Sequence, residues 1–151
     1  MADAYIFDAV RTPRGKGKKD GSLHEITGLS LASQVLEALR QPLEQHIARL
    51  TSVTQALLGD LAAGKVNQAL ANSALYLKVF GHAVIGWRWL EQALRAERGL
   101  AEGNPADADF YRGKLQAARY FLTWEVPGCH DELAILEARD DTCLAMQDAW
   151  F

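Results

Sequence analysis

A long apolar segment at helical spacing dominates the middle of this chain. The pattern favours one helix from about Val66 to Arg98, on the order of 50 Å long at ~1.5 Å per residue. Its centre, ALYLKVFGHAVIGWRWL (residues 74–90), is apolar on most of its circumference. Such a helix is normally buried on more than one side. Gly81 and Gly86 would each weaken an isolated helix by ~1 kcal/mol, so we expect a close neighbouring helix at both.

Helical periodicity continues before this segment. A helix is predicted from Pro42 to about Ala63, because proline is tolerated in the first turn and the apolar residues that follow recur at helical spacing. Gly64 is well placed to end this helix. The apolar face of the predicted helix consists of Ile47, Leu50, Thr54, Leu57, Leu58 and Leu61.

Helical periodicity also continues after it. Residues 99–109, GLAEGNPADAD, are predicted to be a linker because they combine glycine, proline and acidic residues. A helix capped by Asp107 or Asp109 is then expected over residues 110–126, and a last helix over residues 130–140. Short connections between such helices predict an all-α fold, an antiparallel helical bundle of about four helices.

The first 41 residues have a different pattern. Residues 4–10, AYIFDAV, suit a strand, and residues 11–25 form a predicted glycine-rich basic loop. Ser30 can cap a helix from Leu31 to Arg40. We therefore expect a short strand-loop-helix appendage, whose strand is poorly held because it has no partner strand downstream.

Composition excludes several classes of protein. The 151 residues are 49% apolar, which is enough for one packed domain, and the net charge of −3 does not suggest nucleic-acid binding. Polar residues such as Lys78 and His82 interrupt the apolar segment, so no membrane span is expected. Cys129 and Cys143 share no spacing with histidines that would form a metal site. Two free thiols in a reducing cytosol, and hence a cytoplasmic protein, are the simplest interpretation.

The amino-terminal segment carries one family resemblance. AVRTPRGKGKKDGSLHE (residues 9–25) followed by SLASQVLEALR (residues 30–40) resembles the amino-terminal end of thiolases, the acetyl-CoA acetyltransferase family. In that family the nucleophilic cysteine and its assisting histidine and cysteine lie far beyond this segment. Neither Cys129 nor Cys143 stands in a thiolase-like context. The resemblance therefore implies a partial, non-catalytic segment over residues 1–41.

The remaining chain carries a second resemblance. About residues 43–151 resemble the carboxy-terminal helical domain of a subgroup of large bacterial acyl-CoA dehydrogenases, most specifically in FYRGKLQAARYF (residues 110–121). In those enzymes this domain is appended to a catalytic core that holds the flavin site, the acyl-CoA cleft and the catalytic glutamate. The resemblance therefore implies no catalytic residue and no cofactor in this chain. The segments that carry it are residues 45–58, 71–94, 110–127 and 140–151.

The two resemblances meet near Arg40–Leu43, so a seam between residues 1–41 and a helical domain over residues 42–151 is expected in a chimeric or truncated chain. Both families serve fatty-acid β-oxidation. The first functional hypothesis is an oligomerisation or interaction module that packs against another copy or an acyl-CoA dehydrogenase core and has no independent activity. The alternative is an acyl-CoA-binding or dehydrogenase- or acetyltransferase-related fragment with residual activity, supported only by the basic loop at residues 11–19.

Aromatic residues are numerous for so short a helical chain. Aromatic side chains at helical spacing usually belong to a core, but they are also enriched at protein interfaces, and both interpretations stay open. The aromatic carboxy-terminal tail adds weight to the interface hypothesis, because exposed aromatic residues are costly unless they dock. The candidate interface residues are Phe80, Trp87, Trp89, Tyr120, Trp124, Trp150 and Phe151.

The titratable residues give no catalytic constellation. His82 is expected to be a core histidine with one satisfied hydrogen bond, and His24, His46 and His130 share no metal-ligand spacing. Glu125 is expected at a helix end facing water rather than in an apolar catalytic setting. No catalytic, cofactor-binding or metal-binding residue is therefore predicted.

Overall fold

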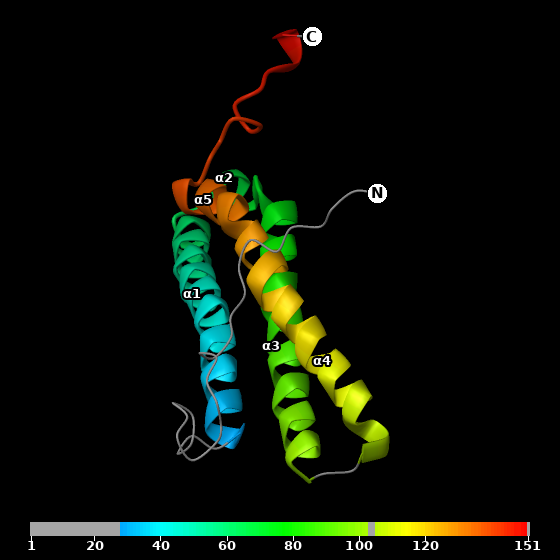
Figure 1. Cartoon of the computed structure of the whole chain (residues 1–151). Coiled ribbons are helices and arrows are strands. Elements are labelled where there is room, and N and C mark those ends of the chain that lie inside the picture. The colour runs from blue at the N-terminus through cyan, green and yellow to red at the C-terminus, as the bar shows by residue number, and fades with distance from the viewer. Residues whose placement is uncertain (1–27, 103–104, 151) are drawn as a thin grey trace.

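Three long helical arms pack side by side in the computed structural model, which describes residues 28–102 and 105–150 (Figure 1). The first arm is α1 (Gly28–Ala62), and the second is α3 (Ser73–Glu102), which runs antiparallel to α1 after the short helix α2 (Val66–Leu70). All regular secondary structure in the described ranges is helical, so the predicted all-α bundle is confirmed. The predicted strand at residues 4–10 and the loop at residues 11–25 lie outside the described ranges.

The third arm consists of consecutive helical segments that cross α3 and end against α1. Its order is η1 (Pro105–Asp107), α4 (Ala108–Tyr120), the π-helical turn η2 (Phe121–Glu125), η3 (Pro127–Cys129) and α5 (His130–Ala138). Beyond α5 the chain leaves the bundle and ends in the single turn η4 (Asp148–Trp150) (Figure 1).

The α1 helix corrects two predicted boundaries. It is continuous from Gly28 to Ala62, so it neither begins after Ser30 nor restarts at Pro42, which lies inside it. Pro42 cannot donate a backbone hydrogen bond to the carbonyl of Ala38, and an interior proline costs about 3 kcal/mol. Burial of Leu39 and Leu43, on either side of the proline, offsets that cost. The predicted end is confirmed, because Gly64 takes φ 76° just after the helix.

The predicted helix from Val66 to Arg98 is interrupted. A turn at Ala71 and Asn72 separates α2 from α3, and α3 continues beyond the prediction to Glu102. The interruption turns the Asn72 amide toward the end of the third arm, where its Nδ2 donates to the carbonyl of Asp140 at 2.7 Å. Gln68 Nε2 donates to the carbonyl of Arg139 at 2.6 Å in the same way. These side chains satisfy the carbonyls of the two residues that follow α5.

The boundaries of the third arm also differ slightly from the prediction. The linker is shorter than residues 99–109, because Gly99 remains in α3 and packs against the Tyr111 ring of α4. The predicted helix over residues 110–126 is confirmed, but its last part, η2, is π-helical rather than α-helical. There the amide of Val126 donates to the carbonyl of Phe121 at 3.0 Å. The last helix ends at Ala138 because Arg139 adopts a left-handed conformation, with φ 51°.

Three apolar clusters hold the arms together. Small residues on the inner face of α3, including Ala83, Ala93 and Ala96, are buried and let the helices approach closely. The cluster nearest α5 contains Leu50, Val53, Val79, Ala83, Cys129, Leu133 and Leu136. The middle cluster contains Leu39, Leu43, Leu122 and Val126, and the third contains Leu36, Ala93 and Ala118.

Candidate interaction surface and polar cleft

The outer face of α3 carries an apolar row that the bundle leaves exposed. Five side chains recur at alternating intervals of three and four residues, and Glu91 occupies one position within the row. Leu77 is 70% exposed and Trp87 is 59% exposed. We call this row the α3 stripe; its members are Leu77, Phe80, Val84, Trp87 and Leu94.

The α3 stripe is exposed because the opposite side of the same helix is already packed. Val79 and Ala93 on the inner side are fully buried, and Gly86 between them lies against Leu43 of α1. At 100° per residue, positions 79, 86 and 93 lie on one side of α3 and positions 77 and 84 on the other. The long apolar helix is therefore buried on the side that faces the other two arms, and its outer side is open. The expectation that it would be buried on more than one side is wrong for the part of the chain that the structure describes.

The other candidate interface residues fall elsewhere. Trp89 is partly buried in the bundle, where it packs against the Leu36–Ala93–Ala118 cluster and Lys114 lies 5.5 Å from its ring centroid. Tyr120 and Trp124 are exposed on the third arm. Trp150 is exposed on the carboxy-terminal segment, and Phe151 lies outside the described residues. Of the seven predicted residues, only Phe80 and Trp87 share the α3 stripe.

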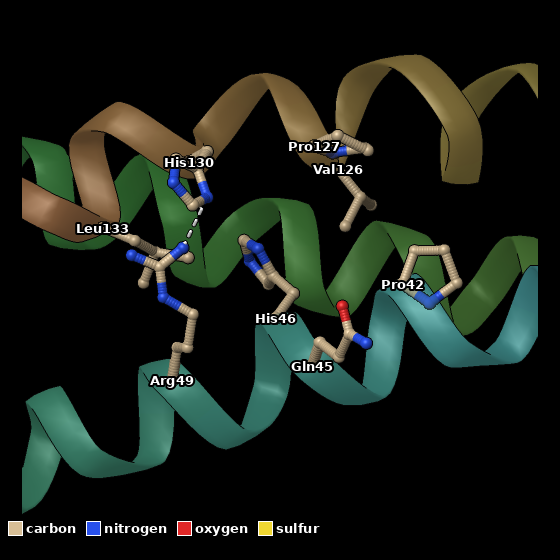
Figure 2. Close-up of a pocket in the computed structure, with 8 residues that line it drawn as sticks. All are labelled: Pro42, Gln45, His46, Arg49, Val126, Pro127, His130 and Leu133. Atoms are coloured by element: carbon tan, nitrogen blue, oxygen red, sulfur yellow. Dashed lines mark hydrogen bonds between the residues drawn. The ribbon is translucent and has the colours of Figure 1, made fainter.

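A second feature is a cleft of about 400 Å³ between α1 and the η3–α5 segment (Figure 2). His46 and Arg49 rise into it from α1, and His130 faces them from the start of α5. Apolar side chains complete the walls. The lining residues are Pro42, Gln45, His46, Arg49, Val126, Pro127, His130 and Leu133.

Arg49 is the main cationic group of this cleft, and it is already engaged. Its Nε and Nη2 donate to the two carboxylate oxygens of Glu137 at 2.7 and 2.8 Å. Its Nη1 lies 2.8 Å from His130 Nδ1, as the dashed line in Figure 2 shows. A guanidinium can only donate, so His130 Nδ1 accepts and the neutral ring carries its proton on Nε2. The hydrogen bond from Arg49 lowers the pKa of Glu137. The group ties α1 to α5 and leaves Arg49 little capacity for an anionic ligand.

His46 is the buried histidine of the cleft. Its Nε2 lies 3.0 Å from the carbonyl of Val79 on α3, and because a carbonyl only accepts, Nε2 carries the proton. Burial lowers the pKa of His46 from its ordinary value near 6.5. The hydrogen bond to the Val79 carbonyl acts in the opposite direction and raises this pKa. The neighbouring His82 and Arg49 lower this pKa further. His46 is therefore held neutral as a link between α1 and α3.

Sequence reasoning missed that His46 and His130 share a cleft. They lie on different helices far apart in the chain, so no fixed spacing connects them. One signal was available, because His46 interrupts the apolar face of α1 between Leu43 and Leu50. A polar residue at such a position is usually buried and hydrogen-bonded, as His46 is.

The remaining candidate groups have structural roles. His82 is half-buried, its Nδ1 lies 2.9 Å from the carbonyl of Lys78, and its ring stacks on Phe121. The single hydrogen bond expected for this histidine is thus present, but its predicted place in the core is wrong, because the side chain is only half-buried. Glu125 is half-buried and accepts a hydrogen bond from the Tyr120 hydroxyl at 2.8 Å. That bond raises the pKa of Tyr120.

The described ranges contain neither a candidate metal site nor a candidate membrane span. No group of three or more potential metal-ligating side chains occurs in residues 28–102 and 105–150. In the same part of the chain, no helix combines the length and the apolar character that crossing a bilayer requires. Both cysteines are free thiols, Cys129 buried and Cys143 exposed, and burial raises the pKa of Cys129.

The architecture defines a helical domain whose organised features are an exposed apolar row and a polar link between its arms. Residues 22–147 match the protein family described as acetyl-CoA dehydrogenase C-terminal like, and the chain belongs to this family. The family assignment agrees with the resemblance over residues 43–151. The match also includes residues 22–41, which the sequence placed in a thiolase-like segment; that assignment stays a prediction. No curated protein matches the chain.

Proposed function

We propose that this chain is a non-catalytic helical interaction module that self-associates through the α3 stripe. The observation that supports it is a row of six positions at alternating three- and four-residue intervals, of which five carry exposed apolar side chains and one carries Glu91. This spacing is that of a helix seam that packs against a second helix. Exposed apolar patches of this kind mark interaction sites in proteins.

The order of the stripe suits a second copy of the same chain. Read from either end, positions 77, 80, 84, 87, 91 and 94 give the same intervals. Two antiparallel copies of α3 would therefore place Leu77 opposite Leu94 and Val84 opposite Trp87. A symmetric dimer requires such a self-complementary surface. Glu91 would face Phe80, and the ion pair of Glu91 with Arg88 at 2.5 Å keeps that carboxylate partnered.

The energy of such a contact is of the order that a weak dimer requires. Burial of one large apolar side chain contributes roughly 1.5–3 kcal/mol, and a symmetric interface buries the five stripe residues of each copy in part. The total is on the order of 10 kcal/mol, comparable to the estimated ~4–15 kcal/mol cost of association. We therefore expect a reversible dimer rather than an obligate one.

The other hypotheses have less support. Packing against a dehydrogenase core agrees with the description of the family but would use a partner whose surface is unknown. Residual acyl-CoA binding depends on the basic loop at residues 11–19, which lies outside the described residues. Two free thiols suit a reducing compartment, and we infer a cytoplasmic location from them.

A pair of charge substitutions tests the proposal. The double variant Val84→Glu/Trp87→Glu should weaken self-association relative to the wild-type chain in sedimentation velocity, because it puts carboxylates at the centre of the stripe. Ile85→Glu is the matched control: Ile85 has nearly the same exposure as Val84 but lies on a different side of α3. An unchanged mass distribution in the double variant, or equal loss in the control, would contradict the proposal.

A further inference from the structure

The chain after α5 presents apolar side chains that its own bundle does not cover. All residues from 141 to 150 are exposed, including Leu144, Met146 and Trp150, and Trp150 is 64% exposed. We call residues 141–150 the C-terminal arm. Figure 1 shows it running away from the bundle beyond α2 and α5. We propose that this arm docks Trp150 into an apolar cleft of a second copy, a contact beyond the α3 stripe and on a different surface.

The start of the arm is fixed in place, which sets its direction. Arg139 adopts a left-handed conformation after α5. Asp140 then accepts from the amide and the hydroxyl of Thr142 at 3.2 and 3.0 Å, which makes a turn. The carbonyls of Arg139 and Asp140 are held by Gln68 and Asn72. The arm therefore leaves from a rigid base beside α2, directed outward rather than back over its own bundle.

The arm keeps its outward course with local bonds alone. The amide of Ala145 donates to the carbonyl of Asp141 at 2.8 Å, and the amide of Trp150 donates to the carbonyl of Gln147 at 3.0 Å. These are turns within the arm. Three large apolar side chains on such a short exposed segment suit docking on another molecule.

A cleft that fits the arm lies at the same end of the molecule. It is an apolar hollow of about 200 Å³ between the end of α1, α2 and the start of α3. A cavity of about 150 Å³ accommodates a benzene ring, so this cleft can accept an aromatic side chain such as that of Trp150. Its walls are Thr54, Leu57, Leu58, Leu61, Ala69, Leu70, Ser73 and Tyr76.

Two of the apolar residues that line this cleft are largely exposed to solvent. Leu58 and Leu70 are both more than half exposed. The floor is ordered by a 2.9 Å hydrogen bond between the hydroxyls of Thr54 and Tyr76. An occupant that covered the two leucines would remove two large exposed apolar side chains at this end of the bundle from water.

Charge at the edge of the cleft complements the arm. Lys65, in the turn between α1 and α2, forms no ion pair with any residue that the structure describes. It lines a polar hollow next to the start of the arm, together with Asp60, Gln68, Ala138 and Arg139. The Asp60 carboxylate is paired there with Arg139 at 3.2 Å, which leaves Lys65 as the cation of the hollow that has no ion-pair partner among the described residues. Asp148 of the arm likewise has no cation partner within the described ranges and precedes Trp150 by two residues. Docking of Trp150 would bring this carboxylate to the same end of the partner as Lys65.

The geometry favours exchange between two copies. Ten residues span at most about 33 Å when fully extended, and the two turns make the arm shorter than that. It still projects clear of the bundle, so an arm from one copy can reach a cleft on another that faces it (Figure 1). Each copy offers its arm and its cleft at the same end of the bundle. A two-fold axis at that end would let two copies exchange arms reciprocally, which closes the assembly.

The test uses two full-length variants made in the Val84→Glu/Trp87→Glu background, so that the α3 stripe does not contribute. The arm variant carries Trp150→Ser and Leu144→Ser, and the cleft variant carries Leu58→Glu and Leu70→Glu. In sedimentation equilibrium the background should dimerise. Each variant alone should dimerise at least about tenfold more weakly, a loss of 1.4 kcal/mol or more.

Mixing the two variants distinguishes docking of the arm on a second copy from docking of the arm on its own bundle. An equimolar mixture should recover a heterodimer, since the intact arm of the cleft variant can enter the intact cleft of the arm variant. A monomeric background, or a mixture no heavier than its components, would overturn arm exchange. These outcomes are independent of the α3 stripe, which is tested by comparing the background with the wild-type chain. If the background variant does not fold, the arm and cleft substitutions are made in the wild-type chain instead. Each variant should then have a lower average mass than the wild-type chain, and the equimolar mixture should regain mass.

Discussion

Gly86 of α3 lies against Leu43 of α1 so closely that a Cβ on the glycine would be 2.9 Å from Leu43 Cδ1. Leu122 and Val126 of the third arm lie within 3.5 Å of the same point. All three arms therefore meet at one glycine. This contact holds the inner face of α3 in the bundle and directs the α3 stripe outward.

Gly81 and Gly99 of α3 should respond differently to alanine. Gly99→Ala should lower the free energy of unfolding by about 1–3 kcal/mol, because the added carbon would overlap the Tyr111 ring. Gly81 has open space around it, so Gly81→Ala should raise that free energy by up to ~1 kcal/mol through helix propensity. Urea unfolding at one fixed protein concentration measures both. The close neighbouring helix expected from the sequence is thus present at Gly86 but not at Gly81. A destabilised Gly81→Ala variant would contradict the open space found around Gly81.

Leu122 should be among the most sensitive apolar residues. It is fully buried in the π-helical turn, against Leu39 and Leu43 of α1. Leu122→Ala should therefore cost about 2–5 kcal/mol by leaving a cavity. Ile135→Ala is the control, because Ile135 is 39% exposed on α5 and its truncation should cost much less. Similar losses in both variants would contradict the packing described for η2.

The Arg49–Glu137 pair should contribute to stability in a pH-dependent way. The hydrogen bond from Arg49 holds the pKa of Glu137 below its ordinary value of 4.5. Stability from this pair is therefore present above that value and is lost as the pH falls through the lower, folded-state pKa. Glu137→Gln should destabilise the protein at pH 7, by less than ~1 kcal/mol because solvent screens the pair, and hardly at all well below that pKa. A variant whose loss is as large in acid as at pH 7 would exclude this role.

His46 should make the fold sensitive to mild acid. Burial, with smaller effects of His82 and Arg49, holds the folded-state pKa of His46 below the ordinary 6.5. The unfolded chain therefore binds this proton first, and stability falls as the pH drops below about 6.5 until the folded-state pKa is reached. Thermal melting of His46→Gln between pH 5 and 7.5 should lack this component. His130→Gln, on the exposed side of the cleft, should keep it.

The helical content and most helix positions were predictable because apolar periodicity is a local property. The break at Asn72 was not, because it depends on a hydrogen bond to Asp140, which is distant in the sequence. At Pro42 the error was the opposite one: a helix boundary was predicted where the helix is continuous. Burial of Leu39 and Leu43 around the proline stabilises the helix there. Local rules fail where tertiary contacts supply the stabilisation.

The sequence alone could not distinguish all the aromatic residues of the exposed surface from those that pack inside the bundle. Phe80 and Trp87 lie in the α3 stripe, whereas Trp89, only two residues later, turns into the bundle and packs near Leu115. Periodicity shows which residues share a face, but it does not say which face meets the other arms. That assignment depends on the small residues Gly86 and Ala93, whose role is visible only once α1 and α4 are in place.

The most direct test of the central claim is the absolute mass of the wild-type chain. Size-exclusion chromatography with light scattering over a tenfold concentration range measures it. Self-association predicts a mass above that of the 16.6 kDa monomer, shifting toward the monomer on dilution. A constant monomeric mass throughout that range would contradict the proposal that the α3 stripe pairs two copies.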